Sequence, residues 1–116
     1  MKHIDSHPLK GHLFESFITS EFIKKRYNNV QQNNLYYFRD NNGNEVDLIL
    51  DYSDTYVAIE IKSSATISTQ FFKGLNYYSN INKSISKKYL LFGGEETDLF
   101  NDIEIIPYHL IEKIVI

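Results

Sequence analysis

The chain has 116 residues, a length that supports a single domain, residues 1–116, with one hydrophobic core. Its formal net charge is −3, which excludes a protein that coats nucleic acid by bulk attraction but leaves room for a local basic groove. It has no cysteine, so disulfides and thiolate metal sites are excluded. No apolar run is long enough to cross a membrane, and we expect a cytoplasmic protein without a membrane partner.

The first predicted element is an amphipathic helix over residues 9–27. Its apolar side chains recur at three- and four-residue spacing and form a stripe that includes Leu13 and Phe17. Glu15 lies at the edge of this stripe. Glu21 falls near its centre, where a carboxylate is costly to bury unless it is paired or bound. The simplest expectation is a rim position for Glu15 and an ion pair for Glu21.

Three strands are predicted next, over residues 35–39, 45–51 and 56–62, and they form an antiparallel meander. The last two strands alternate with period two around a four-residue polar turn, which indicates a hairpin. That turn pairs the residues that are equidistant from it: Asp51 with Tyr56, Asp47 with Glu60, and Glu45 with Lys62. The predicted core face carries the apolar residues of the alternation: Val46, Leu48, Leu50, Val57, Ile59 and Ile61.

The opposite face of this hairpin places two carboxylates side by side. Directly opposed residues have Cβ atoms about 5 Å apart, and like charges at that distance destabilise a hairpin. A divalent cation between Asp47 and Glu60 would offset the repulsion, and Lys62 projects from the same face as Glu60. The alternative is an ordinary amphipathic hairpin with a solvated charged face. Ile49 and Ala58 on that same face indicate instead that it is partly covered.

The remaining elements complete an α/β domain. A helix capped by Ser68 or Thr69 is predicted to end near Asn80, and a short buried strand follows at residues 88–92. A strand, a helix and a strand in this order predict a right-handed crossover to a parallel neighbour. Residues 95–102 are expected to form a loop, residues 103–106 a last strand, and residues 108–116 a terminal helix.

The acidic pair indicates a specific chemistry. Asp47, Glu60, the Ile61 carbonyl and waters make an oxygen-rich site that suits Mg²⁺ or Mn²⁺. Lys62 beside it could orient or help to deprotonate an attacking water, or stabilise negative charge on a phosphorane-like transition state. These are the components of metal-dependent phosphodiester hydrolysis.

Asp47, twelve intervening residues and then Glu60-Ile61-Lys62 resemble the motif of the PD-(D/E)XK nuclease superfamily. The predicted order of elements is similar too, and Gly11-His12-Leu13-Phe14-Glu15 resembles the N-terminal acidic motif of that superfamily. More narrowly, four segments are similar to the C-terminal domain of unknown function that follows the ATPase module in many prokaryotic AAA+-type ATPases. They are residues 11–21, 37–40, 45–49 and 60–64.

The resemblance implies a restriction endonuclease-like α-β-β-β-α-β core with a mixed central sheet flanked by helices. It implies that Asp47 and Glu60 bind the metal, that Lys62 is catalytic and that Glu15 is the helix-borne acid. It also makes Gln70 a candidate DNA contact through the RecB-like branch, although Tyr77 and Tyr78 come later than the tyrosine of that branch. Two further candidate DNA contacts are Arg39 and Lys73. Val46 stands where many members have proline.

Two functions of different classes follow. The first is a Mg²⁺- or Mn²⁺-dependent nuclease-like domain that hydrolyses DNA. The second is a catalytically silent regulatory or interaction domain that docks on an ATPase module or another protein. Formation of a homodimer is a further possibility that the sequence does not decide. The sequence has no Walker-type loop, so the chain is either a domain taken from a longer protein or a free-standing relative. A pure nucleic-acid binder is disfavoured by the negative net charge.

Overall fold

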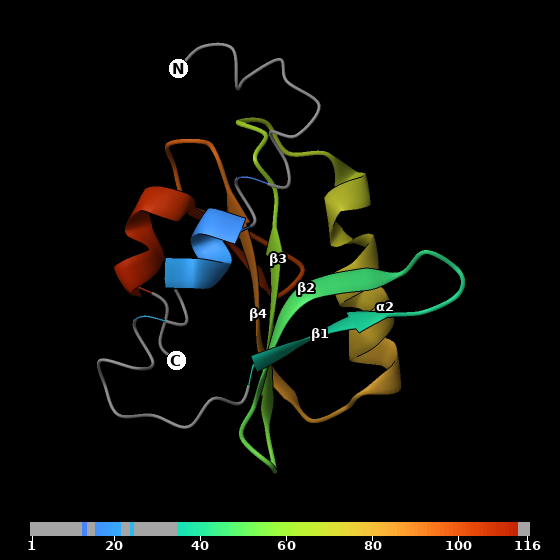
Figure 1. Ribbon diagram of the computed structural model, residues 1–116. Helices are drawn as coiled ribbons and strands as arrows, with labels where there is room; N and C mark the ends of the chain where they lie inside the picture. The colour runs from blue at the N-terminus through green and yellow to red at the C-terminus, as the bar shows by residue number, and fades with distance from the viewer. Residues whose placement is uncertain (1–12, 14–15, 22–23, 25–34, 114–116) are drawn as a thin grey trace.

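The computed structural model describes residues 13, 16–21, 24 and 35–113 (Figure 1). Six strands of this part form one mixed sheet with the order β1-β2-β3-β4-β6-β5. The strands are β1 (Leu35–Arg39), β2 (Glu45–Asp51), β3 (Tyr56–Ile61), β4 (Ile85–Phe92), β5 (Asp98–Phe100) and β6 (Ile103–Pro107). The helical elements after β3 are η2 (Thr69–Phe72), α2 (Lys73–Ile81) and η3 (Tyr108–Lys113). The predicted α/β class with a mixed sheet is confirmed.

The direction of each strand follows from its connection. Short turns join β1, β2 and β3 into the predicted antiparallel meander, and α2 carries the chain over to β4, which is parallel to β3. β6 is parallel to β4, and β5 pairs with β6 antiparallel at the edge. The prediction that residues 95–102 form only a loop is therefore wrong. Asn101 and Asp102 adopt positive φ angles of 47° and 70°, and this tight turn folds β5 back onto β6.

Two hydrophobic clusters lie on the two faces of the sheet. One cluster contains Ile18 from the first helix and Ile106, and η3 packs against it through Leu110 and Ile111. The other lies under α2 and contains the α2 side chain Leu75. Figure 1 shows the first helix and η3 on one side of the strands, and η2 and α2 on the other. Every central strand therefore has two buried faces, which explains why β3 is buried almost throughout.

A β-bulge changes the predicted faces of β2. Phe38 pairs with Val46 and Tyr36 pairs with Ile49, so one β1 residue opposes two β2 residues. Val46 therefore packs in the cluster under α2, together with Ile49. The prediction that Val46 shares a face with the rest of the predicted core set is wrong for this reason. The prediction that the opposite face is partly covered is confirmed, because Ile49 and Ala58 are completely buried there.

The predicted hairpin register holds only near its turn. Asp51 pairs with Tyr56 as predicted, and the ladder between β2 and β3 ends where Leu48 pairs with Ile59. The predicted pairing of Glu45 with Lys62 is wrong, because the ladder does not extend to Glu45 and β3 ends at Ile61. Glu45 pairs with Arg39 of β1 instead. The strands of the hairpin separate beyond this point because the bulge bends β2 away from β3.

Close backbone packing holds α2 against β2. A Cβ atom at Gly74 would overlap the Glu45 carbonyl oxygen, so only glycine lets the helix approach this closely. Phe38 packs on this helix, with its ring centroid 5.0 Å from that of Tyr78. Ser68 caps the start of η2 as predicted, because its hydroxyl accepts a hydrogen bond from the Gln70 amide.

The outer helices differ in part from expectation. The predicted first helix over residues 9–27 is helical at Leu13, residues 16–21 and Lys24, and the rest of it lies outside the described residues. Glu21 pairs with Lys24 at 3.5 Å, as expected for a carboxylate near the stripe. The terminal segment is 3₁₀ over Tyr108–Lys113, with a kink at Leu110, and not one regular helix. None of the described helices is long and apolar enough to cross a membrane.

Candidate functional site

Two carboxylates fill the gap where β2 separates from β3. The Asp47 amide donates a hydrogen bond to Glu60 Oε1 at 3.2 Å, and the Ile61 amide donates to Asp47 Oδ2 at 2.8 Å. In a regular ladder these amides would bond to carbonyls of the facing strand. Each acid therefore satisfies a backbone donor of the opposite strand. The prediction that Asp47 and Glu60 face each other across the hairpin is met by these contacts, although the regular ladder has already ended.

The Ile61 carbonyl belongs to the same gap. The amide and carbonyl of one strand residue point to the same side of the strand. Because the Ile61 amide points to Asp47, its carbonyl points toward the β2 side as well. The Lys62 amide, one residue on, turns the other way and donates to the Leu91 carbonyl of β4 at 2.8 Å. The Ile61 carbonyl therefore points to the same side of β3 as its amide, toward Asp47, and is the candidate third oxygen.

Glu60 is the member of the pair that is harder to ionise. It is only 5% exposed, while Asp47 is half-buried. Burial raises the pKa of Glu60 far above its ordinary value, and the hydrogen bond with Asp47 and the charge of Asp47 raise it further. The Lys62 ammonium lowers this pKa only in part. The metal-free pair therefore holds a proton that a divalent cation would replace.

Lys62 lies at the entrance to the pair. Its ammonium is 3.9 Å from Glu60 Oε2 and 5.5 Å from the centroid of the Phe71 ring. The side chain is 35% exposed, so the ammonium reaches both solvent and the buried carboxylate. Phe71 belongs to η2, which places the start of the helical segment after β3 against the lysine. The contact with Phe71 was missed because the sequence shows this residue only as part of an apolar helix face.

The loop after Lys62 is fixed by the end of β4. The Gly93 amide donates to the Ser64 carbonyl at 2.9 Å. A Cβ atom at Gly93 would overlap the Ser63 carbonyl oxygen, so the two segments pack backbone to backbone. This contact limits the movement of the chain that carries Lys62.

The other predicted site residues do not join the acidic pair in the described structure. Gln70 and Lys73 are exposed on η2 and at the start of α2. Arg39 lies on β1, where it forms an ion pair with Glu45 at 3.6 Å. Glu15 lies outside the described residues. Among the residues that are described, no group of three or more His, Cys, Asp or Glu side chains could hold a metal ion.

The donor set nevertheless fits a hard cation. Two carboxylates and one carbonyl are the oxygen ligands that Mg²⁺ and Mn²⁺ take, and Mg²⁺ commonly keeps waters or substrate phosphates for its other positions. A separate groove of about 1000 Å³ runs over β4, β5 and β6 and is lined in part by Lys87, Asp98 and Glu104. Its lining mixes both signs of charge and does not include the acidic pair. The acidic pair is therefore the stronger candidate.

The fold and this site define an α/β domain with a mixed six-stranded sheet and an acidic pair, of which Glu60 is buried, at the open end of a hairpin. The family described as Domain of unknown function (DUF4143) matches residues 10–111, so the chain belongs to this family. The match contains every residue of the candidate site, together with Glu15. No curated protein and no solved structure matches the chain.

Proposed function

We propose that this domain is a Mg²⁺- or Mn²⁺-dependent nuclease-like domain that hydrolyses phosphodiester bonds of DNA. The observation that carries the proposal is the burial of Glu60 against Asp47, with the Lys62 ammonium 3.9 Å away. A buried carboxylate in contact with a second, half-buried one opposes folding unless a proton or a cation neutralises the pair.

The residues have separate roles in this proposal. Asp47, Glu60 and the Ile61 carbonyl would hold the cation, which supplies Lewis-acid activation of the phosphate and of the attacking water. Lys62 orients that water and stabilises the negative charge that develops on the scissile phosphate. Glu15 is proposed as a further acid from the first helix.

The topology supports a restriction endonuclease-like core. Three antiparallel strands, a helix and a strand parallel to the third follow one another along the chain. This is the β-β-β-α-β part of the core that the sequence resemblance implies. Asp47 lies near the start of the second strand and Glu60 near the end of the third, where the two antiparallel strands come together, and the lysine follows the third strand.

A catalytically silent interaction domain is the second candidate. Its support is a group of exposed apolar side chains on the other face of the sheet. Phe17 is 52% exposed and contacts Tyr108 edge to face, with ring centroids 6.5 Å apart, and Leu13 is also exposed. On this proposal the group docks on an ATPase module or another protein partner, and the acidic pair is structural.

A hydrolysis assay separates the two candidates. Wild-type protein, Lys62→Ala and the control Lys83→Ala are incubated with single-stranded and duplex DNA in Mn²⁺ and in EDTA. Lys83 is exposed at the opposite end of β4 and serves as a matched surface lysine. The nuclease proposal predicts metal-dependent cleavage that falls about 100- to 1000-fold in Lys62→Ala and is unchanged in the control. Equal cleavage by wild type and Lys62→Ala would identify a contaminant and reject the proposal.

A further inference from the structure

We propose that Tyr37 and Arg39 of β1 form a stacking platform for an unpaired base of single-stranded DNA. This inference rests on the proposed function and names the form of DNA that the acidic pair would receive. The signal in the sequence is an aromatic residue and an arginine two positions apart on one strand, which places both on one face.

The bulge places Tyr37 beside the acidic pair. Tyr37 is the single β1 residue that opposes Asp47 and Leu48 in the register between β1 and β2. Neighbouring strands lie about 4.8 Å apart, so the backbone of Tyr37 is one strand away from that of Asp47. Phe38, the next residue, turns under α2, and Tyr37 therefore projects from the opposite face. Leu48 packs on that same opposite face.

The platform is open to solvent. Tyr37 is 67% exposed, and the side chain of Arg39 is 64% exposed. The Arg39 guanidinium lies 5.9 Å from the centroid of the Tyr37 ring, which is cation–π distance. An aromatic ring and a guanidinium plane are the two surfaces on which proteins stack unpaired bases.

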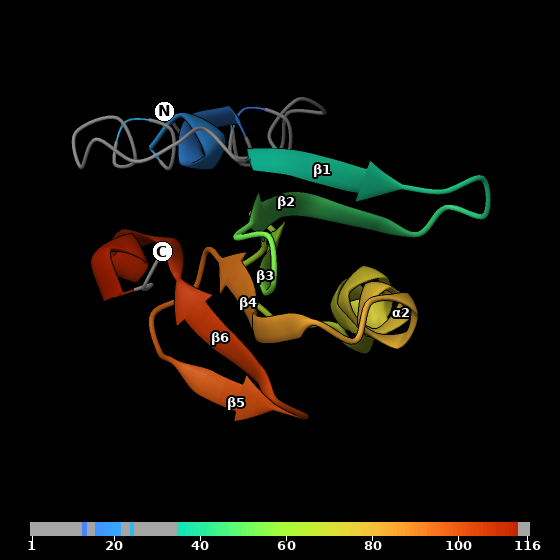
Figure 2. The same ribbon diagram turned by 90° about the horizontal axis from the view of Figure 1, so that it is seen from below.

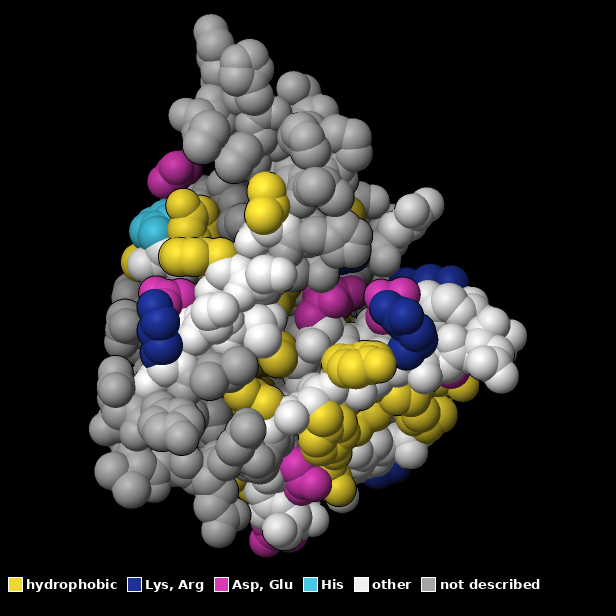
Figure 3. All heavy atoms as spheres, viewed as in Figure 1, with side chains coloured by type: hydrophobic (Ala, Val, Ile, Leu, Met, Phe, Trp, Pro, Cys, Tyr) yellow, Lys and Arg dark blue, Asp and Glu magenta, His cyan; other side chains and the backbone are white. Residues whose placement is uncertain are grey.

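The arrangement of the chain leaves room for a strand of DNA. Figure 2 shows β1, β2 and their turn extending as an arm beyond the rest of the sheet. On the face shown in Figure 3, acidic, basic and hydrophobic side chains gather where this arm meets the body of the molecule. Tyr37 projects from the face opposite α2, whereas Lys62 contacts Phe71 on the α2 side, so a DNA strand that stacks on Tyr37 would reach the acidic pair around the open end of the hairpin.

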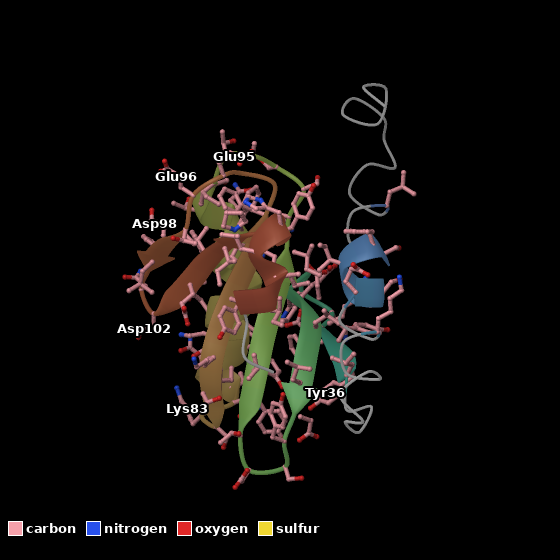
Figure 4. All side chains as sticks on the ribbon, turned by 90° about the vertical axis from the view of Figure 1, so that its left-hand side faces the viewer. Tyr36, Lys83, Glu95, Glu96, Asp98 and Asp102 are labelled. Carbon is pink, nitrogen blue, oxygen red and sulfur yellow. The ribbon has the colours of Figure 1, made fainter. Side chains whose placement is uncertain are left out.

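The charge distribution favours stacking over phosphate attraction. Glu45 lies 3.6 Å from Arg39 and offsets part of its charge. Glu95, Glu96, Asp98 and Asp102 lie in and around β5, at the edge of the sheet opposite β1, where Tyr36 lies (Figure 4). Asp40 and Glu45 lie in the arm itself, so its net charge does not attract phosphates. A platform with few cations attracts phosphates weakly, so its affinity must come from stacking on the faces of the bases. In duplex DNA those faces are covered by the neighbouring base pairs. Single-stranded DNA is therefore the expected form.

The number of cations at the platform also sets how strongly DNA binding depends on salt concentration. Each phosphate contact contributes a slope of about −0.7 to the plot of log K against log salt concentration for a single strand. With Arg39 and one further cation such as Lys62, the slope should be no steeper than about −1.5. A steep slope would indicate a groove that binds the phosphate backbone and would overturn the platform.

The test measures binding of a fluorescein-labelled oligothymidylate by anisotropy in Ca²⁺ buffer, because Ca²⁺ takes the same oxygen ligands. Tyr37→Ala should weaken binding about 5- to 150-fold, the range for loss of one base–aromatic stack. Tyr37→Phe keeps the ring and should bind as wild type does. Tyr108→Ala removes an exposed tyrosine from η3 and is the matched control. A blunt duplex of the same length should bind more weakly than the single strand.

Three results would overturn the platform: absent binding by the wild type, equal affinity of wild type and Tyr37→Ala, or equal loss in Tyr108→Ala. Mn²⁺ titration without DNA separates this failure from failure of the proposed function. Intact Mn²⁺ binding with no Tyr37-dependent DNA binding rejects only the platform. Tyr37-dependent DNA binding without Mn²⁺ binding or cleavage rejects only the hydrolytic function. Thermal unfolding followed by circular dichroism verifies that each variant is folded.

Discussion

Replacement of Glu60 by glutamine should make the stability of the metal-free protein less sensitive to pH. Burial first, and then Asp47, raise the pKa of Glu60 in the folded state. The folded protein therefore holds a proton that the unfolded chain releases above the ordinary carboxylate pKa, and the free energy of unfolding falls as pH rises through this window. Glutamine has the same shape, can accept from the Asp47 amide and does not titrate. The free energy of unfolding of Glu60→Gln should therefore not show this fall as pH rises.

The magnitude follows from one proton. A difference of one bound proton changes the free energy of unfolding by about 1.4 kcal/mol per pH unit. Between pH 6 and pH 8 the wild type should therefore lose up to about 3 kcal/mol relative to Glu60→Gln. With a urea m-value of about 1.5 kcal/mol/M, the relative midpoint shift is about 2 M.

Urea unfolding in EDTA at pH 6, 7 and 8 measures this difference, with Glu96→Gln as a control at an exposed position. Mn²⁺ should restore the stability of the wild type at pH 8 and not that of Glu60→Gln, because the ion binds the deprotonated carboxylate. The same pH dependence in wild type and Glu60→Gln would refute the account of a buried, protonated Glu60.

Three further predictions test the surroundings of the site. Gly74→Ala should destabilise the protein by about 3 kcal/mol in urea unfolding, the upper end of the usual cost of overpacking, since the added methyl group overlaps a β2 backbone carbonyl that cannot turn aside as a side chain can. Gly43→Ala, with φ of 83° and open space around it, should cost only about 1 kcal/mol, and equal costs would contradict the close approach of α2. Phe71→Leu should lower the rate of DNA cleavage about 2- to 5-fold through loss of the contact with Lys62, and Phe71→Tyr should restore it; unchanged cleavage in Phe71→Leu would remove this role. Hydrogen bonds from a turn side chain and from turn amides lower the pKa of Asp40, so the turn should stay closed at neutral pH and open as pH falls through that lowered pKa. Amide exchange of the turn residues against pH would show no such step if these hydrogen bonds were unimportant.

The hairpin was predictable because its signal is local. The alternation along β2 and β3 and the polar turn between them fix which residues face each other near Asp51 and Tyr56. The same local pattern predicts that Glu60 and Lys62 share a face, and their ion pair agrees with this.

The bulge was not predictable from either strand alone. It depends on how β1 pairs with β2, and the alternation of β2 continues through it without interruption. As a result, the sequence placed Val46 on the wrong face and left the strand separation at Asp47 unrecognised. The close approach of Gly74 to β2 is likewise a tertiary contact with no local signal.

The edge strand β5 was not predicted for a different reason. Its three residues, Asp98–Phe100, lie among polar residues and are all exposed, so they carry no alternating pattern that would indicate a strand. Pairing with β6 alone defines this element. Phe100 stacks on Phe72 of η2 at 4.7 Å between ring centroids, a contact that joins distant segments and that the sequence could not indicate.

Mn²⁺ binding tests the central claim most directly, because it requires no assumption about the DNA substrate. Calorimetric titration of the wild type, Asp47→Asn and the exposed turn control Asp54→Asn at pH 8 gives the comparison. Asparagine can still accept the hydrogen bond from Ile61, so the variant keeps the hairpin contact. The account predicts saturable binding to the wild type and to Asp54→Asn that is lost in Asp47→Asn. Equal binding to all three proteins would show that the acidic pair does not hold the cation.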